Sequence, residues 1–333
     1  MKKYVLNQNF SLDLNTTTCI KGVLALMVLF CHLHARVDIF ATSILGTVFS
    51  AFGYLAVSVF FFLSGYGLSE VSSKKEKYIA TFPLKKLLPF FCLSAFTIIM
   101  YLLRDLIVSN QICFLEVIQS FLIGDTIVDN GWYMQVQMLF YILFYLAYRF
   151  GKNKKNVLLI ILVSIYCIAG YTFDMATTWY EASLCFPLGA IYSASKERIK
   201  KTFVLHKLLF LVSIGILSST FIVALFLGNK TILPEGLRIM VKMISSILFS
   251  LLFALFFSKF NINFFFTRFL GKYSLEIYLT QGIFLSLFVE QLPIKNDWLY
   301  MLVTTVATIV FSIFVHPLFN FIIKLGNKFK KKA

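Results

Sequence analysis

The amino-acid sequence predicts an all-α fold, a polytopic transmembrane bundle of about ten helices with both termini in the cytoplasm. Three observations support this prediction. Hydrophobic residues make up 59% of the 333-residue chain, whereas soluble domains contain roughly 45–50%. Charged residues make up only 14%, whereas about a quarter is usual. Finally, apolar runs long enough to cross a bilayer recur along the whole chain, and the cations between them alternate in number.

Each apolar run of about 20 residues is a candidate transmembrane helix, because that length of α-helix crosses the hydrocarbon core. Residues 4–19 are polar and no small-residue cleavage site follows the first run, so this run is expected to stay in the mature protein. The loops leave no room for a soluble domain, and 1–333 is treated as a single membrane domain. The ten predicted helices are 17–35, 44–68, 86–104, 131–149, 156–172, 178–195, 207–227, 238–257, 273–291 and 298–323.

Lysine and arginine alternate between the two sets of loops, and this alternation predicts the orientation. Every second loop, together with the two termini, holds 24 of the 31 cations, and the opposite loops hold five. Because cytoplasmic loops carry the excess of Lys and Arg, the cation-rich ends are predicted to be cytoplasmic. The membrane then explains the net charge of +16, with the basic tail 324–333 at its surface, and no nucleic-acid partner is expected.

The predicted outer side is rich in aromatic and acidic residues. The tryptophans fit either an aromatic belt at the membrane interface or a surface on which a sugar ring stacks. The longest outer loop, 105–130, is acidic and holds the amphipathic stretch 114–124, which is predicted to lie along the membrane. Six cysteines are scattered singly through the chain, so neither a disulfide framework nor a metal site is expected. The three tryptophans at outer helix ends are Trp132, Trp179 and Trp298.

The first predicted helix carries a cation near its start and two histidines near its end. Ionisable residues inside a membrane segment are costly to insert, so they are functional candidates. Lys21 and His32 are separated by three turns plus about 20°, so they share a face and lie about 16 Å apart along the axis. His34 lies roughly 200° from His32 around the helix. One interpretation pairs an anion-binding cation with a histidine base. The other is a snorkelling lysine with an interfacial histidine.

The second predicted helix ends in the sequence FFFLSGYGL, residues 60–68. Its small residues Ser64, Gly65 and Gly67 are expected at the cytoplasmic end, level with Lys21. Small side chains at this point allow either a neighbouring helix or a ligand to approach closely. The first two helices are therefore expected to form a hairpin whose inner end is cationic and lined with glycine.

These two elements resemble the acyltransferase family 3 membrane proteins. That family typically shows Arg-x10-His at the end of its first helix and an FF-x-x-SG-like element at the end of its second. Here Lys21 and His32 have the same spacing, and FFFLSG follows in the same order. The likeness spans nearly the whole chain. The further matches are Gly131-Trp132-Tyr133 with Phe140-Tyr141, then Phe186-Pro187-Leu188-Gly189, then Leu270-Gly271-Lys272-Tyr273-Ser274-Leu275 with Ile277-Tyr278-Leu279.

The chain departs from the family pattern at several positions. Lys21 stands where the family has Arg, and it lacks the planar fork that grips a phosphate in two places. Gln137 stands where many members have Glu, and Gln281 stands where many have His. The usual Arg-x-x-Arg before a proline is replaced by the pair Lys85-Lys86. No catalytic role is assigned to either glutamine on the sequence alone.

The resemblance implies an enzyme that transfers an acyl group, most often acetyl, from cytoplasmic acyl-CoA to a hydroxyl of a glycan or lipid-linked sugar. It implies a multi-pass protein of the cell (plasma or inner) membrane, with acyl-CoA as a co-substrate and no permanently bound cofactor. His32 is then the catalytic residue, either as a general base on the acceptor hydroxyl or as a transient acyl-imidazole. Lys21 is the expected phosphate contact, and Ser64 and Gly65 are expected to line the donor site.

Other polar groups are candidates for supporting roles. Glu276 is an intramembrane carboxylate, which usually has a partner, and Lys21 is the expected one. His34 is expected to be interfacial or to help at the outer mouth. His316 precedes Pro317 and is expected to bond a carbonyl freed by the proline kink. The candidates for holding an acceptor sugar on the outer side are Trp132, Trp179, Tyr180, Glu181 and Lys242.

Other function classes stay open at this point. A transporter or flippase for a lipid-linked glycan would use the same cationic face without consuming acyl-CoA. A glycan polymerase is disfavoured, because the outer loops are short and the cations gather on the inner side. A non-catalytic family member, acting as a sensor or an assembly partner, is compatible with Gln137 and Gln281.

Overall fold

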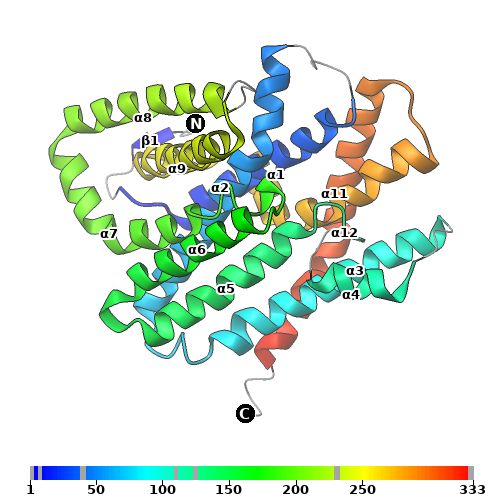
Figure 1. The fold of residues 1–333 in the computed structure, drawn as a ribbon, viewed down its shortest axis with the longest axis horizontal. Coiled ribbons are helices and arrows are strands. Elements are labelled where there is room, and N and C mark those ends of the chain that lie inside the picture. The colour runs from blue at the N-terminus through cyan, green and yellow to red at the C-terminus, as the bar shows by residue number, and fades with distance from the viewer. Residues whose placement is uncertain are drawn as a thin grey trace.

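The computed structural model describes residues 4–6, 10–37, 43–108, 112–122, 127–228 and 233–328, and nearly all of them are helical. Each of the ten apolar runs forms a helix, which confirms the predicted all-α bundle (Figure 1). The helices that correspond to these runs are α1 (Leu14–His34), α2 (Ile44–Lys74), α3 (Leu88–Ile107), α5 (Trp132–Phe150), α6 (Lys155–Thr172), α7 (Cys185–Leu205), α8 (Lys207–Gly228), α9 (Glu235–Lys259), α11 (Ser274–Ser286) and α12 (Asp297–Lys328).

Shorter elements connect or extend these helices. Two are short α-helices outside the ten predicted runs, and α4 is the amphipathic stretch expected along the membrane, with most of its apolar side chains exposed. The shorter elements are β1 (Tyr4–Leu6), η1 (Pro83–Leu87), α4 (Phe114–Leu122), η2 (Lys152–Lys154), η3 (Thr177–Trp179), β2 (Phe260–Ile262), α10 (Phe265–Lys272) and η4 (Leu287–Gln291).

Within the part of the chain that the structure describes, seven segments are long and apolar enough to span a membrane by length and composition. They are α1, α2, α3 with η1, α6 with η2, α8, α9 and α12. The other three predicted runs correspond to α5, α7 and α11. Helix α7 begins at Cys185, later than the predicted 178, because the preceding residues fold as η3 and a series of turns. Helix α11 has 13 residues and continues into the π-turn η4.

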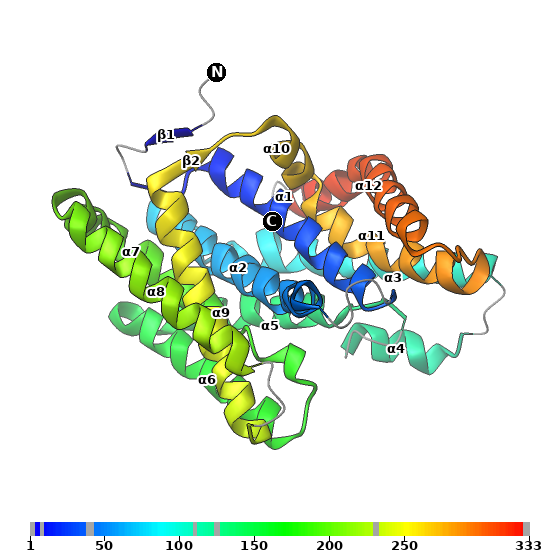
Figure 2. The ribbon, with the colours of Figure 1, turned by 90° about the horizontal axis from the view of Figure 1, so that it is seen from above.

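Helices α1 and α2 lie at the centre of the molecule. Figure 2 shows α7, α8 and α9 on one side of this pair, with α3, α4, α11 and α12 on the other. Helix α1 packs against α2, α10 and α11, and α2 packs against α7 and α9. The hairpin predicted to carry the function is therefore enclosed by protein. Helix α8 instead exposes most of its apolar side chains, as expected for a helix that faces lipid.

The close crossing of α2 and α7 depends on two glycines. A Cβ atom on Gly65 would collide with the carbonyl oxygen of Phe186, and one on Gly189 would collide with that of Phe62. The two contacts are reciprocal, since each glycine lies directly against the backbone of the opposite helix. Without side chains at these points, the helices approach more closely than larger residues allow.

The N-terminal strand lies at the same end of the bundle as the start of α1. β1 pairs antiparallel with β2, with Tyr4 opposite Ile262, and this short ribbon is an addition to the predicted all-α fold. β2 leads into α10, which meets the start of α1 where Gly22 and Gly271 allow the backbones to touch. This end is the one predicted to be cytoplasmic. Of the lysines that predict this orientation, residues 2–3, 230 and 330–332 lie outside the described residues.

Gly65→Ala is expected to destabilise the protein, because the new methyl group meets the Phe186 carbonyl. Overpacking of this kind costs about 1–3 kcal/mol, occasionally more. The melting temperature of the detergent-purified protein measures the effect. The matched control is Gly215→Ala on α8, where an added Cβ meets nothing within 4 Å and alanine favours a helix by up to about 1 kcal/mol over glycine. Equal melting temperatures for the two variants would contradict the packing role of Gly65.

Candidate functional site

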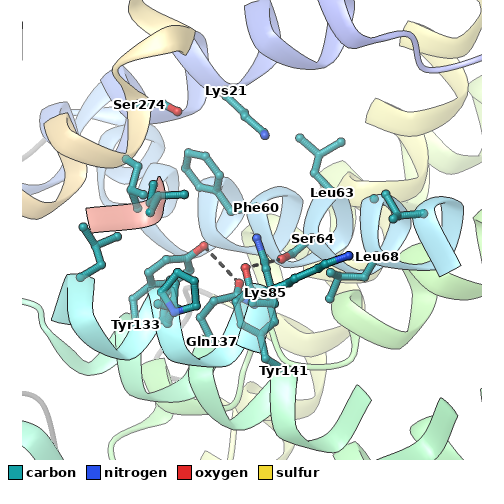
Figure 3. Close-up of a pocket in the computed structure, with 18 of the residues that line it drawn as sticks. Lys21, Phe60, Leu63, Ser64, Leu68, Lys85, Tyr133, Gln137, Tyr141 and Ser274 are labelled. Atoms are coloured by element: carbon teal, nitrogen blue, oxygen red, sulfur yellow. Dashed lines mark hydrogen bonds between the residues drawn. The ribbon is translucent and has the colours of Figure 1, made fainter. Parts of the chain in front are cut away.

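A cavity of about 460 Å³ lies at the end of the bundle that is predicted to face the cytoplasm. Its walls come from the start of α1, the end of α2, η1 with α3, one face of α5, the start of α11 and the end of α12 (Figure 3). Helices that run in alternating directions thus bring distant parts of the sequence to one place. Pockets of roughly 300–1,000 Å³ typically hold small-molecule ligands.

Three lysines line this cavity: Lys21 from α1, and Lys85 and Lys86 from η1. No Asp or Glu occurs among the described residues that line it. Protein surrounds Lys21, yet its side chain is accessible because it borders the open space of the cavity. Lys21 and Lys86 are close enough to repel each other. The cavity is therefore a positively charged site that suits an anionic ligand.

The π-turn of η1 brings two of these lysines to the cavity. Pro89 has no N–H, so it interrupts the α-helical hydrogen-bond pattern. The N–H of Leu88, the residue before it, bonds to the carbonyl of Pro83 five residues back, which is a π-turn. Lys85 and Lys86 lie within this wider turn. The ammonium of Lys86 lies 5.0 Å from the centre of the Tyr141 ring. The aromatic face stabilises the cation at the edge of the membrane.

One face of α5 forms the wall opposite Lys21, as Figure 3 shows. Tyr133, Gln137 and Tyr141 are spaced four residues apart, so they project from one side of the helix. Tyr133 donates a hydrogen bond to Oε1 of Gln137 (3.4 Å), and Ser64 of α2 donates one to the Tyr141 hydroxyl (3.5 Å). Nε2 of Gln137 is buried without a hydrogen-bond partner. It is thus available as a donor to a ligand in the cavity.

The small residues at the end of α2 divide between the cavity and a helix interface. Ser64 and Gly67 line the cavity, whereas Gly65 packs against the backbone of α7. Ser64 and Gly67 are three positions apart and share a face, but Gly65 lies about 100° from Ser64 around the helix. Gly65, which was expected to line the acyl-CoA donor site, therefore packs against α7 instead. Gly67 is the glycine of α2 that borders the cavity.

His32 lies on α1 about 16 Å beyond Lys21 and outside the cavity lining. Its ring is partly buried, and its Nδ1 is buried without a hydrogen-bond partner. The side chain of Gln281 on α11 is within reach of the imidazole, although both atoms of its amide lack a hydrogen bond of standard geometry. His34 lies elsewhere on the helix, with its ring 5.9 Å from that of Phe49.

An aromatic layer separates the cavity from His32. The outermost lining residues of α2, α5 and α11 are Phe60, Tyr133 and Tyr278. The ring of Tyr133 lies 4.8 Å from that of Tyr278 and 6.4 Å from that of Phe60. The Tyr278 hydroxyl donates to the carbonyl of Asn130 (3.0 Å), which ties this layer to the turn before α5. Since Gln281 follows Tyr278 by less than one turn, His32 lies directly beyond these rings.

The expectation that Glu276 pairs with Lys21 is wrong. Oε1 of Glu276 lies 2.6 Å from Nδ1 of His316 on α12, and Nε2 of His316 lies 2.8 Å from the amide nitrogen of Asn320. His316 therefore bonds two side chains, and it does not serve the carbonyl freed by the proline. The pair ties α11 to α12 on a face of α11 that points away from the cavity residues Ser274 and Tyr278.

The candidates for acceptor binding form two pairs on the predicted outer side. The rings of Trp132 and Trp179 lie 6.4 Å apart. The carboxylate of Glu181 lies 3.5 Å from the ammonium of Lys242. Burial raises the pKa of Glu181, although Lys242 opposes this shift. Tyr180 is buried, so it supports the turn before α7 and does not offer a surface to a ligand.

Several cavity residues are not evident from the resemblance. Lys85 and Lys86 break the family's usual pattern of cations, yet both line the cavity. Their place directly before an apolar helix at the cation-rich end is a signal that sequence reasoning can use. The four-residue spacing of Gln137 and Tyr141 on α5 is a second such signal, because it marks a single polar face.

Comparison with known proteins identifies a family. Residues 14–316 match the family model of acyltransferase family 3, which is described as "Acyltransferase domain". The matched range includes the three cavity lysines, His32 and Gln281. A search of curated proteins gave no match, and neither did a search of solved structures.

Removing either partner of the Glu276–His316 pair is expected to destabilise the protein. Glu276→Ala and His316→Ala should each lower the free energy of unfolding by about 1–3 kcal/mol, because a buried polar partner is left unsatisfied. The double variant should lose less than the sum, since both changes remove one interaction. Denaturation in detergent measures these losses. Glu276→Ala combined with Lys21→Ala should be additive, and coupling in this second cycle would contradict the assigned pair.

Proposed function

The chain belongs to the acyltransferase family 3 of membrane proteins, and we propose that it is an O-acyltransferase that modifies a cell-surface or lipid-linked polysaccharide. In this proposal the donor is cytoplasmic acyl-CoA and the transferred group is acetyl. The acceptor is a hydroxyl of the carbohydrate, presented from the outer side of the membrane. The cavity with its three lysines is the observation that carries the proposal.

The chemistry of the cavity fits the donor. Acyl-CoA carries several phosphate groups on one end and a thin, flexible arm with the thioester on the other. Lys21, Lys85 and Lys86 would neutralise the phosphates as point charges. No Asp or Glu occurs in the described lining, so the phosphates would meet no carboxylate on the cavity wall. Ser64 and Nε2 of Gln137 would hydrogen-bond to the amides of the arm.

The arm would extend from the lysines towards His32. Lys21 and His32 lie on nearly the same face of α1, about 16 Å apart, a distance comparable to the length of the pantetheine arm. The layer of Phe60, Tyr133 and Tyr278 lies between them, so one or more of these rings turns aside when the thioester passes. The thioester carbonyl would then meet the acceptor hydroxyl beside His32.

His32 would move the proton in the reaction. In one route the imidazole takes the proton of the acceptor hydroxyl as its oxygen attacks the thioester carbonyl. A C–O bond forms, the C–S bond breaks, and the thiolate of CoA leaves with the proton that His32 held. In the other route the imidazole itself attacks first and CoA leaves as the thiol, after which the hydroxyl takes the acyl group from the ring.

The outer pairs would hold the acceptor. Trp132 and Trp179 present two neighbouring aromatic rings, and sugar rings stack on such surfaces through their apolar faces. Glu181 and Lys242 would bond to hydroxyl or acidic groups of the carbohydrate. These four residues belong to α5, to the segment before α7 and to α9, so an acceptor bound by them would approach α1 from the predicted outer side.

His32→Ala is expected to reduce acyl transfer by about 10²–10⁴-fold, the usual contribution of a general base. Transfer of labelled acetyl from acetyl-CoA to purified glycan acceptor, in membranes that contain the protein, measures the rate. NMR analysis of the surface glycans with and without the gene measures the same function in cells. The control is His206→Ala, because His206 is exposed at the connection of α7 and α8.

The outcomes separate the candidate functions. A normally inserted His32→Ala protein with full activity would refute the assignment of His32. Unchanged acylation of the glycan with altered export, on deletion of the gene, would instead favour a transporter.

Lys21→Met and Lys86→Met are each expected to raise the KM for acyl-CoA about tenfold or more. A hydrogen bond to a charged group contributes about 1.5–3 kcal/mol, and about 1.4 kcal/mol corresponds to a factor of ten in affinity. Lys21→Arg should restore tight binding, because a guanidinium also binds phosphate. Lys77→Met is the control, since Lys77 is exposed and does not line the cavity. An unchanged KM for acyl-CoA in both lysine variants would contradict the assignment of the cavity as the acyl-CoA site.

A further inference from the structure

Gln281 and His32 lie where two faces of the cavity continue outward. On α11, Ser274 and Tyr278 line the cavity, and Gln281 follows them at the spacing i, i+4, i+7 that keeps to one face of a helix. On α1, Lys21 lines the cavity, and His32 lies on nearly the same face. Because α1 packs against α11, the two faces meet beyond the aromatic layer.

The polar atoms at this meeting point lack partners. Gln281 is fully buried, and neither its Oε1 nor its Nε2 has a hydrogen-bond partner. Nδ1 of His32 is also buried without one, although the two side chains are within reach of each other. Buried polar groups in native proteins are nearly always paired. An amide and an imidazole left uncommitted side by side therefore indicate a bond that forms when the site is occupied, because catalytic hydrogen bonds often tighten only in the complex.

The other buried glutamine of the site behaves differently. Oε1 of Gln137 already accepts a hydrogen bond from Tyr133 (3.4 Å), so only its nitrogen is uncommitted. Gln137 faces the donor cavity, whereas Gln281 lies next to the imidazole. The amide oxygen of Gln281 is thus an acceptor beside His32 that has no hydrogen bond in this structure.

We propose that Gln281 is the positioning residue of His32. Its amide oxygen accepts the N–H of the imidazole, which fixes the orientation and tautomer of the ring and leaves the opposite nitrogen to accept the proton of the hydroxyl. An amide performs this task without adding a second charge to a buried position, where an unpaired charge is costly. This inference rests on the proposed function, since it concerns the same reaction.

The test compares Gln281→Met and Gln281→Glu in the acetyl-transfer assay. Methionine has nearly the same shape but no acceptor oxygen, so kcat should fall about tenfold or more while the KM for acetyl-CoA stays within about twofold. The melting temperature should stay the same or rise, because an apolar group replaces an unpartnered amide. Glutamate keeps an acceptor oxygen at the same place, so its kcat should exceed that of Gln281→Met.

The control is Ser246→Ala on α9, where another fully buried polar group without a partner is removed and kcat should not change. Wild-type kcat in Gln281→Met, with His32→Ala inactive, would refute the positioning role and leave the proposed function standing. A folded Gln281→Glu protein no more active than Gln281→Met would refute it as well. Absence of acyl transfer by the wild-type protein would refute the proposed function itself.

Discussion

The inner half of this protein depends on how it accommodates positive charge, since Lys21 and Lys86 are close enough to repel each other. Lys21, Lys85 and Lys86 line one cavity, and no Asp or Glu occurs among the described residues of its lining. Charges so arranged within a bundle of low dielectric are stable only if water or an anion fills the space between them. The open volume of the cavity provides that space. Aromatic and small residues, among them Phe60, Tyr141 and Gly67, line the rest of this space.

The polarity of the site falls off in steps from this end towards His32. Full charges stand at the inner mouth, neutral amide and hydroxyl groups line the middle, and aromatic rings close the cavity before His32 and Gln281. Such an order suits a ligand whose one end is highly charged and whose other end is nearly apolar, because each part meets a matching environment.

Much of the fold follows from the sequence, because length, hydropathy and the alternation of cations are properties of single segments. The ten helices and the shared face of Lys21 and His32 are of this kind. The contacts of Gly65 and Glu276 are not, because they depend on which helix packs on which face. Gly65 lies about 100° from Ser64, and only the position of α7 decides that the glycine serves packing. Likewise, His316 becomes the partner of Glu276 because α12, and not α1, covers that face of α11.

Two departures from the family pattern, Lys21 and Gln137, line the same cavity in this structure. An arginine at position 21 would bind phosphate through a planar fork, whereas a lysine binds it as a point charge. A glutamate at position 137 would place a negative charge on the cavity wall opposite Lys21, where it would compete with an anionic ligand for the lysines. Gln137 preserves the hydrogen bond from Tyr133 and removes that competition. With Lys21 and the neutral Gln137 on its walls, the cavity keeps a positive charge that suits an anionic ligand.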